Sequence, residues 1–224
     1  MPISEVYNMD CMDYMKSIPD KFFDLAIVDP PYGINVGRMN MGAGYGKYCS
    51  NIKNRKWGKN DFDKSIPPSE YFTQLFRVSS NQIIWGANYF GNMPKTRCFL
   101  IWDKGEGMYG RTFSECEYAW TSFNHGARIF KMSPVDKTRI HPTQKPVALY
   151  AWILKNYSQH GYRILDTHLG SGSSRIAAYK LGFDFYATEI DKDYFDAQEE
   201  RFRRECLGEI KTPKGILKQR SLFD

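Results

Sequence analysis

The chain has 224 residues, a formal net charge of +6 and an aromatic content of 16%. This length suits one domain with a substantial core and makes a second full domain unexpected. The mild positive charge is compatible with a polyanionic partner but is also ordinary for an enzyme. The sequence shows no secretory signal and no uncharged apolar stretch of about 18 residues, so neither secretion nor a membrane span is expected.

Short apolar segments predict six or seven strands, several of them continuous rather than alternating, as is typical of a sheet covered on both faces. In chain order they are residues 3–7, 25–28, 82–85, 98–102, 117–121, 163–165 and 185–188. Helical patterns lie at residues 69–77, 145–157, 173–180 and 191–206. Strand and helix alternate at both ends of the chain, which indicates an α/β, three-layer domain.

The strand over residues 25–28 is followed directly by Asp29, Pro30, Pro31 and Tyr32. Methylation of a planar amine requires its lone pair to be drawn back from the ring, which hydrogen-bond acceptors on the two N–H groups achieve. The Asp29 carboxylate and the Pro30 carbonyl can be these acceptors in a turn that two prolines stiffen. Tyr32 can stack on an extruded base. Taken alone, the tetrapeptide is read equally well as a surface turn.

Three segments depart from the strand and helix pattern. Residues 33–60 are rich in glycine, with basic and aromatic residues interleaved, and are interpreted as a mobile loop or lid. Residues 122–140 are basic, with few helix or strand signals, and are interpreted as a short target-recognition segment. For both, a solvated loop is an equal alternative. The basic tail over residues 211–220 is expected to be a frayed terminus.

A glycine-rich turn follows the strand that ends near Asp166. It reads Gly170-Ser171-Gly172 and leads into the helix through Ser174. Such a turn lets the backbone approach a ligand closely and points N–H groups at it. Glu189 ends the next strand, near the offset of about 20 residues at which dinucleotide folds bind ribose hydroxyls. The pair favours a nucleoside site over a phosphate loop, which lacks its lysine here, and over a dinucleotide turn, since residue 175 is Arg.

Three motifs, taken in this order, resemble the β-class DNA adenine-N6 methyltransferases. They are the Asp29 tetrapeptide, His-Pro-Thr-Gln-Lys-Pro at residues 141–146, and Asp166 with the glycine turn. The similarity covers nearly the whole chain. It implies a Rossmann-like class I methyltransferase fold, a three-layer sandwich on a mostly parallel seven-stranded sheet, as one domain over residues 1–224. The motif order is permuted, with the catalytic half ahead of the half that binds S-adenosylmethionine.

The resemblance also implies a role for each matching residue. Asp29, Pro30, Pro31 and Tyr32 would hold the flipped adenine. The implied cofactor-binding residues are Asp10, Cys11, Asp29, His141, Thr143, Lys145, Asp166, Gly170, Ser171, Gly172, Ser174 and Glu189. Double-stranded DNA is the implied partner, in a restriction-modification setting. The resemblance also favours a homodimer, and no metal is needed.

Two features depart from the family pattern. Thr167 and His168 stand where the family usually has Pro and Phe, which bears on how the cofactor packs. For His168 the preferred interpretation is a histidine that satisfies local backbone groups, whereas Lys145 is read as functional. Residues 122–140 are also shorter than the recognition domain of larger members.

Other acceptors and other classes of protein stay open. Cytosine N4 and adenine in RNA use the same chemistry, although Asp29 leans toward adenine because cytosine-N4 relatives more often have Ser there. A nucleic-acid-binding subunit without catalysis is a rival, as is a protein glutamine methyltransferase, which would usually carry Asn at this position. The five cysteines, at positions 11, 49, 98, 116 and 206, form no Cys-x-x-Cys pair, so reduced thiols in a cytoplasmic protein are expected.

With the permuted motif order, Asp166 and Asp29 should lie on adjacent strands near the point where the strand order reverses. Open α/β sheets bind their ligands at this point. The sequence therefore predicts that the cofactor and the target base meet there.

Overall fold

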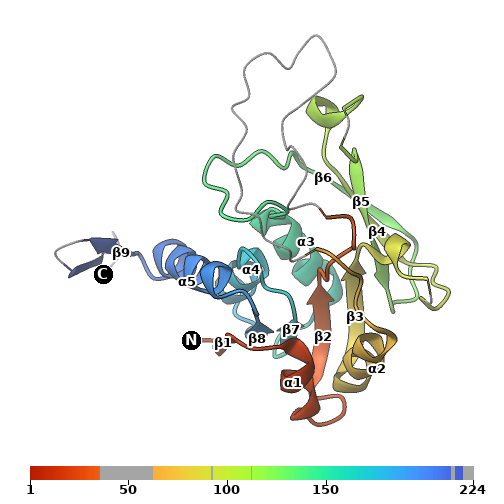
Figure 1. The fold of residues 1–224 in the computed structure, drawn as a ribbon, viewed down its shortest axis with the longest axis horizontal. Coiled ribbons are helices and arrows are strands. Elements are labelled where there is room, and N and C mark those ends of the chain that lie inside the picture. The colour runs from red at the N-terminus through yellow and green to blue at the C-terminus, as the bar shows by residue number, and fades with distance from the viewer. Residues whose placement is uncertain (36–62, 92, 112, 213–214, 219–224) are drawn as a thin grey trace.

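The computed structural model describes residues 1–35, 63–91, 93–111, 113–212 and 215–218. Within these ranges eight strands form one mixed sheet in the order β1-β8-β7-β2-β3-β5-β4-β6 (Figure 1). The strands are β1 (Ser4–Tyr7), β2 (Phe23–Val28), β3 (Ser79–Trp85), β4 (Phe99–Asp103), β5 (Cys116–Thr121), β6 (Arg128–Lys131), β7 (Arg163–Asp166) and β8 (Asp184–Thr188). All pairs are parallel except those of β5, which runs antiparallel to both β3 and β4.

Helices cover both faces of the sheet. They are α1 (Cys11–Lys16), α2 (Ser69–Val78), α3 (Val147–Tyr157), α4 (Ser173–Lys180) and α5 (Lys192–Cys206), with short 3-10 helices η2 (Ala87–Tyr89) and η3 (Glu106–Met108). None of the described helices is long and apolar enough to span a lipid bilayer.

Strand β2 shows why the sheet needs two helical layers. Leu25 and Ile27 pack into the core shared with α3 and α4, whereas Ala26 and Val28 pack into the core shared with α1 and α2. Successive side chains of a strand point to opposite faces, so an uninterrupted apolar run requires cover on both. The three-layer α/β prediction is confirmed, and so is the mostly parallel sheet.

The strand order reverses between β7 and β2, which lie side by side although they are far apart in the chain (Figure 1). Leu25 pairs with Ile164 and Ala26 with Leu165. From β2 the chain proceeds outward to β3, and from β7 it proceeds the other way to β8. The predicted adjacency of the two strands that carry Asp29 and Asp166 is therefore present.

The structure adds elements that the sequence did not predict. All seven predicted strands are present, but β6 forms an eighth inside residues 122–140, where few strand signals were seen. Its side chains are mostly exposed at the edge of the sheet, so it lacks the apolar run that marks a central strand. Helix α1 is only one and a half turns long, too short to show helical periodicity in the sequence.

The prediction of a frayed terminus over residues 211–220 is wrong for its described part. Strands β9 (Glu209–Thr212) and β10 (Gly215–Lys218) form an antiparallel hairpin beyond α5. Among the described strands these two pair only with each other. Such a local hairpin forms without the apolar run that would predict a strand from the sequence. Within the predicted lid, residues 36–60 lie outside the described part of the chain.

Candidate active site

The carboxyl ends of β2, β3, β7 and β8 lie at one edge of the sheet, and Asp29 follows β2 at this edge. The Asp29 carboxylate is bound on both oxygens. Oδ2 accepts a hydrogen bond from the Lys145 Nζ at 2.5 Å, and Oδ1 accepts one from the Tyr32 hydroxyl at 2.5 Å. Residues 141–146 thus meet the Asp29 tetrapeptide, as the permuted reading requires. Pro30 is buried and Pro31 half-buried beside them.

Two further charged residues complete this cluster, and the sequence analysis missed both. The Lys145 Nζ also binds the Glu117 Oε2 at 2.9 Å, and the Lys104 Nζ binds the Glu117 Oε1 at 2.9 Å. Glu117 lies in β5 and Lys104 directly follows β4. The signal in the sequence that could have indicated Glu117 and Lys104 was the presence of a charged residue near the end of each of these two predicted strands. The cluster consists of Lys104, Glu117, Lys145 and Asp29, with alternating charges.

Burial and mutual charge move the pKa values within the cluster. Burial lowers the pKa of Lys145, but the Asp29 and Glu117 charges outweigh this effect and raise it. Burial raises the pKa of Glu117, but the two lysines outweigh it and lower that pKa to about 2. For Asp29, burial and the Glu117 charge together exceed the effect of Lys145, so its pKa is raised. Of the two carboxyls, Asp29 is the more basic.

Tyr32 is held in place from several sides. The Asp63 Oδ1 accepts hydrogen bonds from the backbone N–H groups of Tyr32 at 2.6 Å and Gly33 at 2.8 Å. The Tyr32 ring stacks on Tyr89, with ring centroids 5.0 Å apart and planes 14° from parallel. Gly86 lies against the same ring at a φ of +71°. The aromatic group is thus placed beside Asp29 by groups from two separate segments.

The contact between Gly86 and Tyr32 leads to a prediction. A Cβ at position 86 would lie 2.0 to 2.5 Å from Tyr32 ring carbons, and the positive φ is itself strained for an L residue. We expect Gly86→Ala to displace the ring and to lower strongly any activity that needs Tyr32 beside Asp29. Titration calorimetry with S-adenosylmethionine, the cofactor that the resemblance implies, should find near-normal affinity. Gly91→Ala, where a Cβ would meet nothing within 4 Å, is the matched control.

The glycine turn is organised by Asp166 at the end of β7. Its Oδ2 accepts a hydrogen bond from the Ser174 hydroxyl at 2.6 Å, and its Oδ1 accepts the His168 backbone N–H at 3.1 Å. Burial raises the pKa of Asp166 to about 7, with the Asp29 charge among the further causes. That electrostatic influence, together with the pairing of β2 and β7, places the two acids close together.

Glu189 and Arg201 fix the turn from its other side. The Glu189 Oε2 accepts the Gly170 backbone N–H at 2.7 Å, and its Oε1 accepts the Asp191 N–H at 2.9 Å. Arg201 donates to the Ser171 carbonyl and to the Ser173 hydroxyl, both at 2.9 Å. Each Glu189 oxygen has a second lone pair, so the carboxylate can also accept ligand hydroxyls.

His141 connects residues 141–146 to the glycine turn. A Cβ on Gly170 would lie 3.7 Å from the His141 ring, and that ring lies edge-on to Tyr194 at 4.2 Å. Its Nδ1 lies 3.1 Å from the Thr143 hydroxyl. Burial and the Lys145 charge lower the pKa of His141 to about 3, so the ring is neutral at physiological pH.

Asp10, Cys11 and His168 lie near the Glu189 side of the turn. The Asp10 carboxylate caps α1 through the Met12 N–H at 2.7 Å. Burial, followed by the Asp10 charge, raises the pKa of Cys11 to about 12, and Glu189 contributes as well. His168 bonds the Thr167 hydroxyl at 2.9 Å, and burial lowers its pKa to about 4. This partner is a neighbouring side chain, whereas the sequence favoured local backbone groups as the partners of His168.

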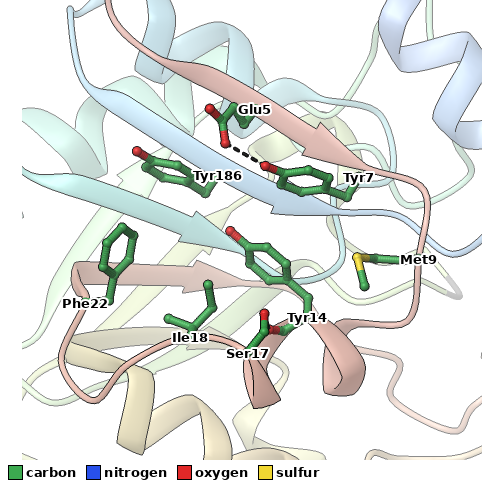
Figure 2. A pocket seen from close by; sticks show the side chains of 8 residues that line it. All are labelled: Glu5, Tyr7, Met9, Tyr14, Ser17, Ile18, Phe22 and Tyr186. Carbon is green, nitrogen blue, oxygen red and sulfur yellow. Dashed lines mark hydrogen bonds between the residues drawn. The ribbon is translucent and has the colours of Figure 1, made fainter.

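A separate hollow of about 430 Å³ lies where α1 faces β1 and β8 (Figure 2). Figure 2 shows the rings of Tyr7, Tyr14, Tyr186 and Phe22 around it, with the Tyr7 hydroxyl bonded to Glu5. None of the predicted site residues lines this hollow. Over the described ranges no group of three His, Cys, Asp or Glu side chains is arranged to hold a metal ion.

The comparisons with known proteins relate the chain to DNA methylases. A family model described as DNA methylase, of the N6/N4 methyltransferases, matches residues 112–200. The type II methyltransferase M2.MboI of Moraxella bovis is 25% identical over 240 residues, covering 88% of this chain and 86% of that protein. Over residues 112–200 the chain is similar to the N6/N4 DNA methylases. Among the clustered residues, Glu117, Lys145 and the glycine turn lie inside the matched range.

Solved structures of this methylase group share the fold of the chain. The crystal structure of the M1.HpyAVI–SAM complex has a TM-score of 0.57 at 20% identity, covering 88% of this chain and 98% of that one. The cytosine-N4-specific PvuII DNA methyltransferase has a TM-score of 0.57 at 11% identity, covering 90% and 87%. At these identities the likeness concerns the fold, which is that of class I methyltransferases.

Proposed function

We propose that this methylase transfers the methyl group of S-adenosylmethionine to the N6 amine of an adenine flipped out of double-stranded DNA. The observation that carries the proposal is the juxtaposition of two sites at the switch point of the sheet. Asp29, held by Lys145 and Tyr32, follows β2, while the glycine turn follows the neighbouring β7. Open α/β sheets bind ligands at this position.

The residues around the glycine turn suit the cofactor. Gly170 and Gly172, with φ values of +53° and +73°, adopt a backbone conformation that side chains disfavour. Glu189 can accept the ribose hydroxyls, and Asp10 would lie toward the adenine end. His141, Thr143 and Lys145 would flank the methionine end. When bound, S-adenosylmethionine supplies an electrophilic sulfonium methyl group.

The role of Glu189 leads to a prediction. Glu189→Gln keeps a carbonyl acceptor for the Gly170 N–H but removes the charge, and Glu189→Ala removes both. We expect the alanine variant to lose about 2 kcal/mol of cofactor affinity, the typical value for hydrogen bonds to a charged group. Titration calorimetry measures this directly, with the exposed Glu200→Ala as control. Unchanged affinity in the alanine variant would rule out the ribose role.

Asp29 and its neighbours act on the acceptor. The Asp29 carboxylate accepts one amine N–H and the Pro30 carbonyl the other, so that the nitrogen lone pair is localised for attack. Tyr32 stacks on the base. Because the two sites share one edge, the amine can be aligned with the methyl group, and this alignment supplies much of the acceleration.

The choice of adenine over cytosine rests on Asp29, because cytosine-N4 relatives more often carry Ser at that position. The fold alone does not discriminate, because the cytosine-N4-specific PvuII enzyme shares it to the same degree as M1.HpyAVI. Mass spectrometry of digested DNA from cells that express the chain separates the products. N6-methyladenine supports the proposal, and N4-methylcytosine would show that cytosine is the acceptor instead. The absence of any methylated base in cells that hold the folded protein contradicts the proposal.

Two segments are proposed to contact DNA. Residues 33–60 follow Tyr32 directly and are proposed as the lid. Residues 122–140, which include β6 with Arg128 and Lys131, are proposed as the recognition segment. A homodimer and a cytoplasmic location complete the proposal. Single-turnover assays on DNA with varied target sequences test the recognition role.

A further inference from the structure

Lys145 is shared between two carboxylates. Its Nζ lies 2.5 Å from the Asp29 Oδ2 and 2.9 Å from the Glu117 Oε2, and only 3% of the residue is exposed. The rings of Trp85 and Tyr32, with centroids 5.3 and 5.8 Å from the Nζ, confine the ammonium group further. The position of this charge is therefore set by the two acids.

Glu117 is placed beside Asp29 by the reversed strand. Because β5 is antiparallel to β3 and β4, its first residues lie at the edge where the parallel strands end. Glu117 pairs in register with Trp102, and Lys104 follows two residues later. The Glu117 side chain thus reaches Lys145 from one side and Lys104 from the other.

We propose that Glu117 is a positioning residue that draws part of the Lys145 charge away from Asp29, so that Asp29 remains a strong hydrogen-bond acceptor for the target amine. The inference rests on the proposed function, since it assigns Asp29 the amine. It adds that Glu117 sets the basicity of the Asp29 carboxylate. Lys104 weakens this effect of Glu117 by neutralising part of its charge.

The reason is electrostatic. A carboxylate whose charge is fully balanced by one ammonium group polarises a third partner weakly, and a shared ammonium group balances it only in part. With Glu117 neutral, Lys145 would bind Asp29 alone and the pKa of Asp29 would fall. With Lys104 neutral, the full Glu117 charge would act on the pair and the pKa of Asp29 would rise. The two changes have opposite signs.

Groups on several elements contribute to the field at Asp29. They are Lys145 and Tyr150 from the residues around and within α3, Glu117 from β5, Asp166 from β7, Tyr71 from α2 and Tyr32 from its own turn. The three tyrosines have raised pKa values because of burial and stay neutral at physiological pH. The expected directions of the change in the Asp29 pKa are therefore set by Lys104, Glu117 and Lys145.

The test compares Glu117→Gln with Lys104→Met. The Asp29 carboxyl is titrated by carbon NMR, and its signal is assigned as the one absent from Asp29→Asn. A neighbouring charge moves a pKa by about one pH unit or more, so we expect a shift of about one pH unit downward in the first variant and upward in the second. The acid limb of the kcat profile should move in the same directions.

Rates give a second readout. At pH values where Asp29 is fully ionised, kcat of Glu117→Gln should be up to about tenfold below that of the wild type. The reason is that lowering the pKa of the Asp29 acceptor by one unit corresponds to a factor of about ten. KM for S-adenosylmethionine should not change. Glu115→Gln, an exposed carboxylate two residues away, is the control and should leave both readouts unchanged.

The outcomes separate this inference from the proposed function. Shifts in the same direction for both variants, or no shift, overturn the inference even if the wild type methylates DNA. If the wild type transfers no methyl group to DNA, the proposed function fails, and the NMR titration still decides whether Glu117 controls Asp29. If Glu117→Gln does not fold, Lys104→Met must show the upward shift alone, and without it the inference is rejected.

Discussion

Asp29→Ala should abolish methyl transfer while S-adenosylmethionine binding stays measurable. In the proposed mechanism the substitution removes the acceptor that polarises the amine, and losing one preorganised hydrogen-bond partner of a reacting group typically costs about 10²- to 10³-fold in kcat. Lys145 keeps Glu117 as a partner at 2.9 Å, so the cluster is not left with an isolated charge. A labelled-methyl assay on DNA gives the rate, and calorimetry gives the cofactor affinity.

The Asp29 pKa gives this prediction a pH dependence. That pKa is raised above its usual value, chiefly by burial, and transfer requires the ionised form. The wild-type rate should therefore fall as the pH drops through the raised pKa, and Asp29→Asn should lack this acid limb at its residual rate. Asp13→Ala, an exposed acid on α1, is the control. If purified Asp29→Ala turned over at the wild-type rate, the proposed role of Asp29 in methyl transfer would be rejected.

Lys145→Met should have the second large effect, on stability as well as on activity. It leaves Asp29 facing Glu117 without the ammonium group that they share, and only Glu117 keeps a lysine partner, Lys104. Breaking a buried ion pair by removing one partner costs about 3 to 5 kcal/mol. We expect the lower end of this range, because the Asp29 and Glu117 side chains are 17% and 21% exposed.

The loss should depend on pH with a defined sign. Without Lys145 the pKa values of both acids rise, so protonation stabilises the folded variant and this stabilisation disappears as the pH rises through the raised values. Urea unfolding should therefore show a smaller deficit relative to the wild type at mildly acidic pH than at neutral pH. Lys192→Met, which removes an exposed pair with Asp196, should show little deficit at either. Equal deficits at both pH values would contradict this account.

The sequence predicted the framework because the central strands are apolar on both faces. Runs such as residues 25–28 and 163–165 can be buried only in a covered parallel sheet. The motifs at their ends then give Asp29 and Asp166 a common edge. By contrast, β6 and the hairpin of β9 and β10 depend on pairing with exposed side chains, which leaves no periodic apolar signal.

The cluster was only half predictable for a related reason. Asp29 and Lys145 belong to motifs in which the chemistry of methyl transfer explains the type of residue at each position. Glu117 and Lys104 stand at the ends of strands whose direction the sequence does not reveal. Had β5 been parallel, Glu117 would lie at the opposite edge of the sheet. Asp63 and Gly86 were missed likewise, because their contacts with Tyr32 and its backbone depend on the way the chain folds back.

The pairing of β2 with β7 also has a consequence for biosynthesis and truncation. Until residues 163–166 are in place, the β2 backbone has one side without a strand partner, and such an apolar edge invites association with other chains. A fragment ending before Arg163 should therefore aggregate, although it contains the complete Asp29 tetrapeptide and Lys145. Co-expression of the missing segment, as a separate polypeptide, supplies the strand that would close that edge.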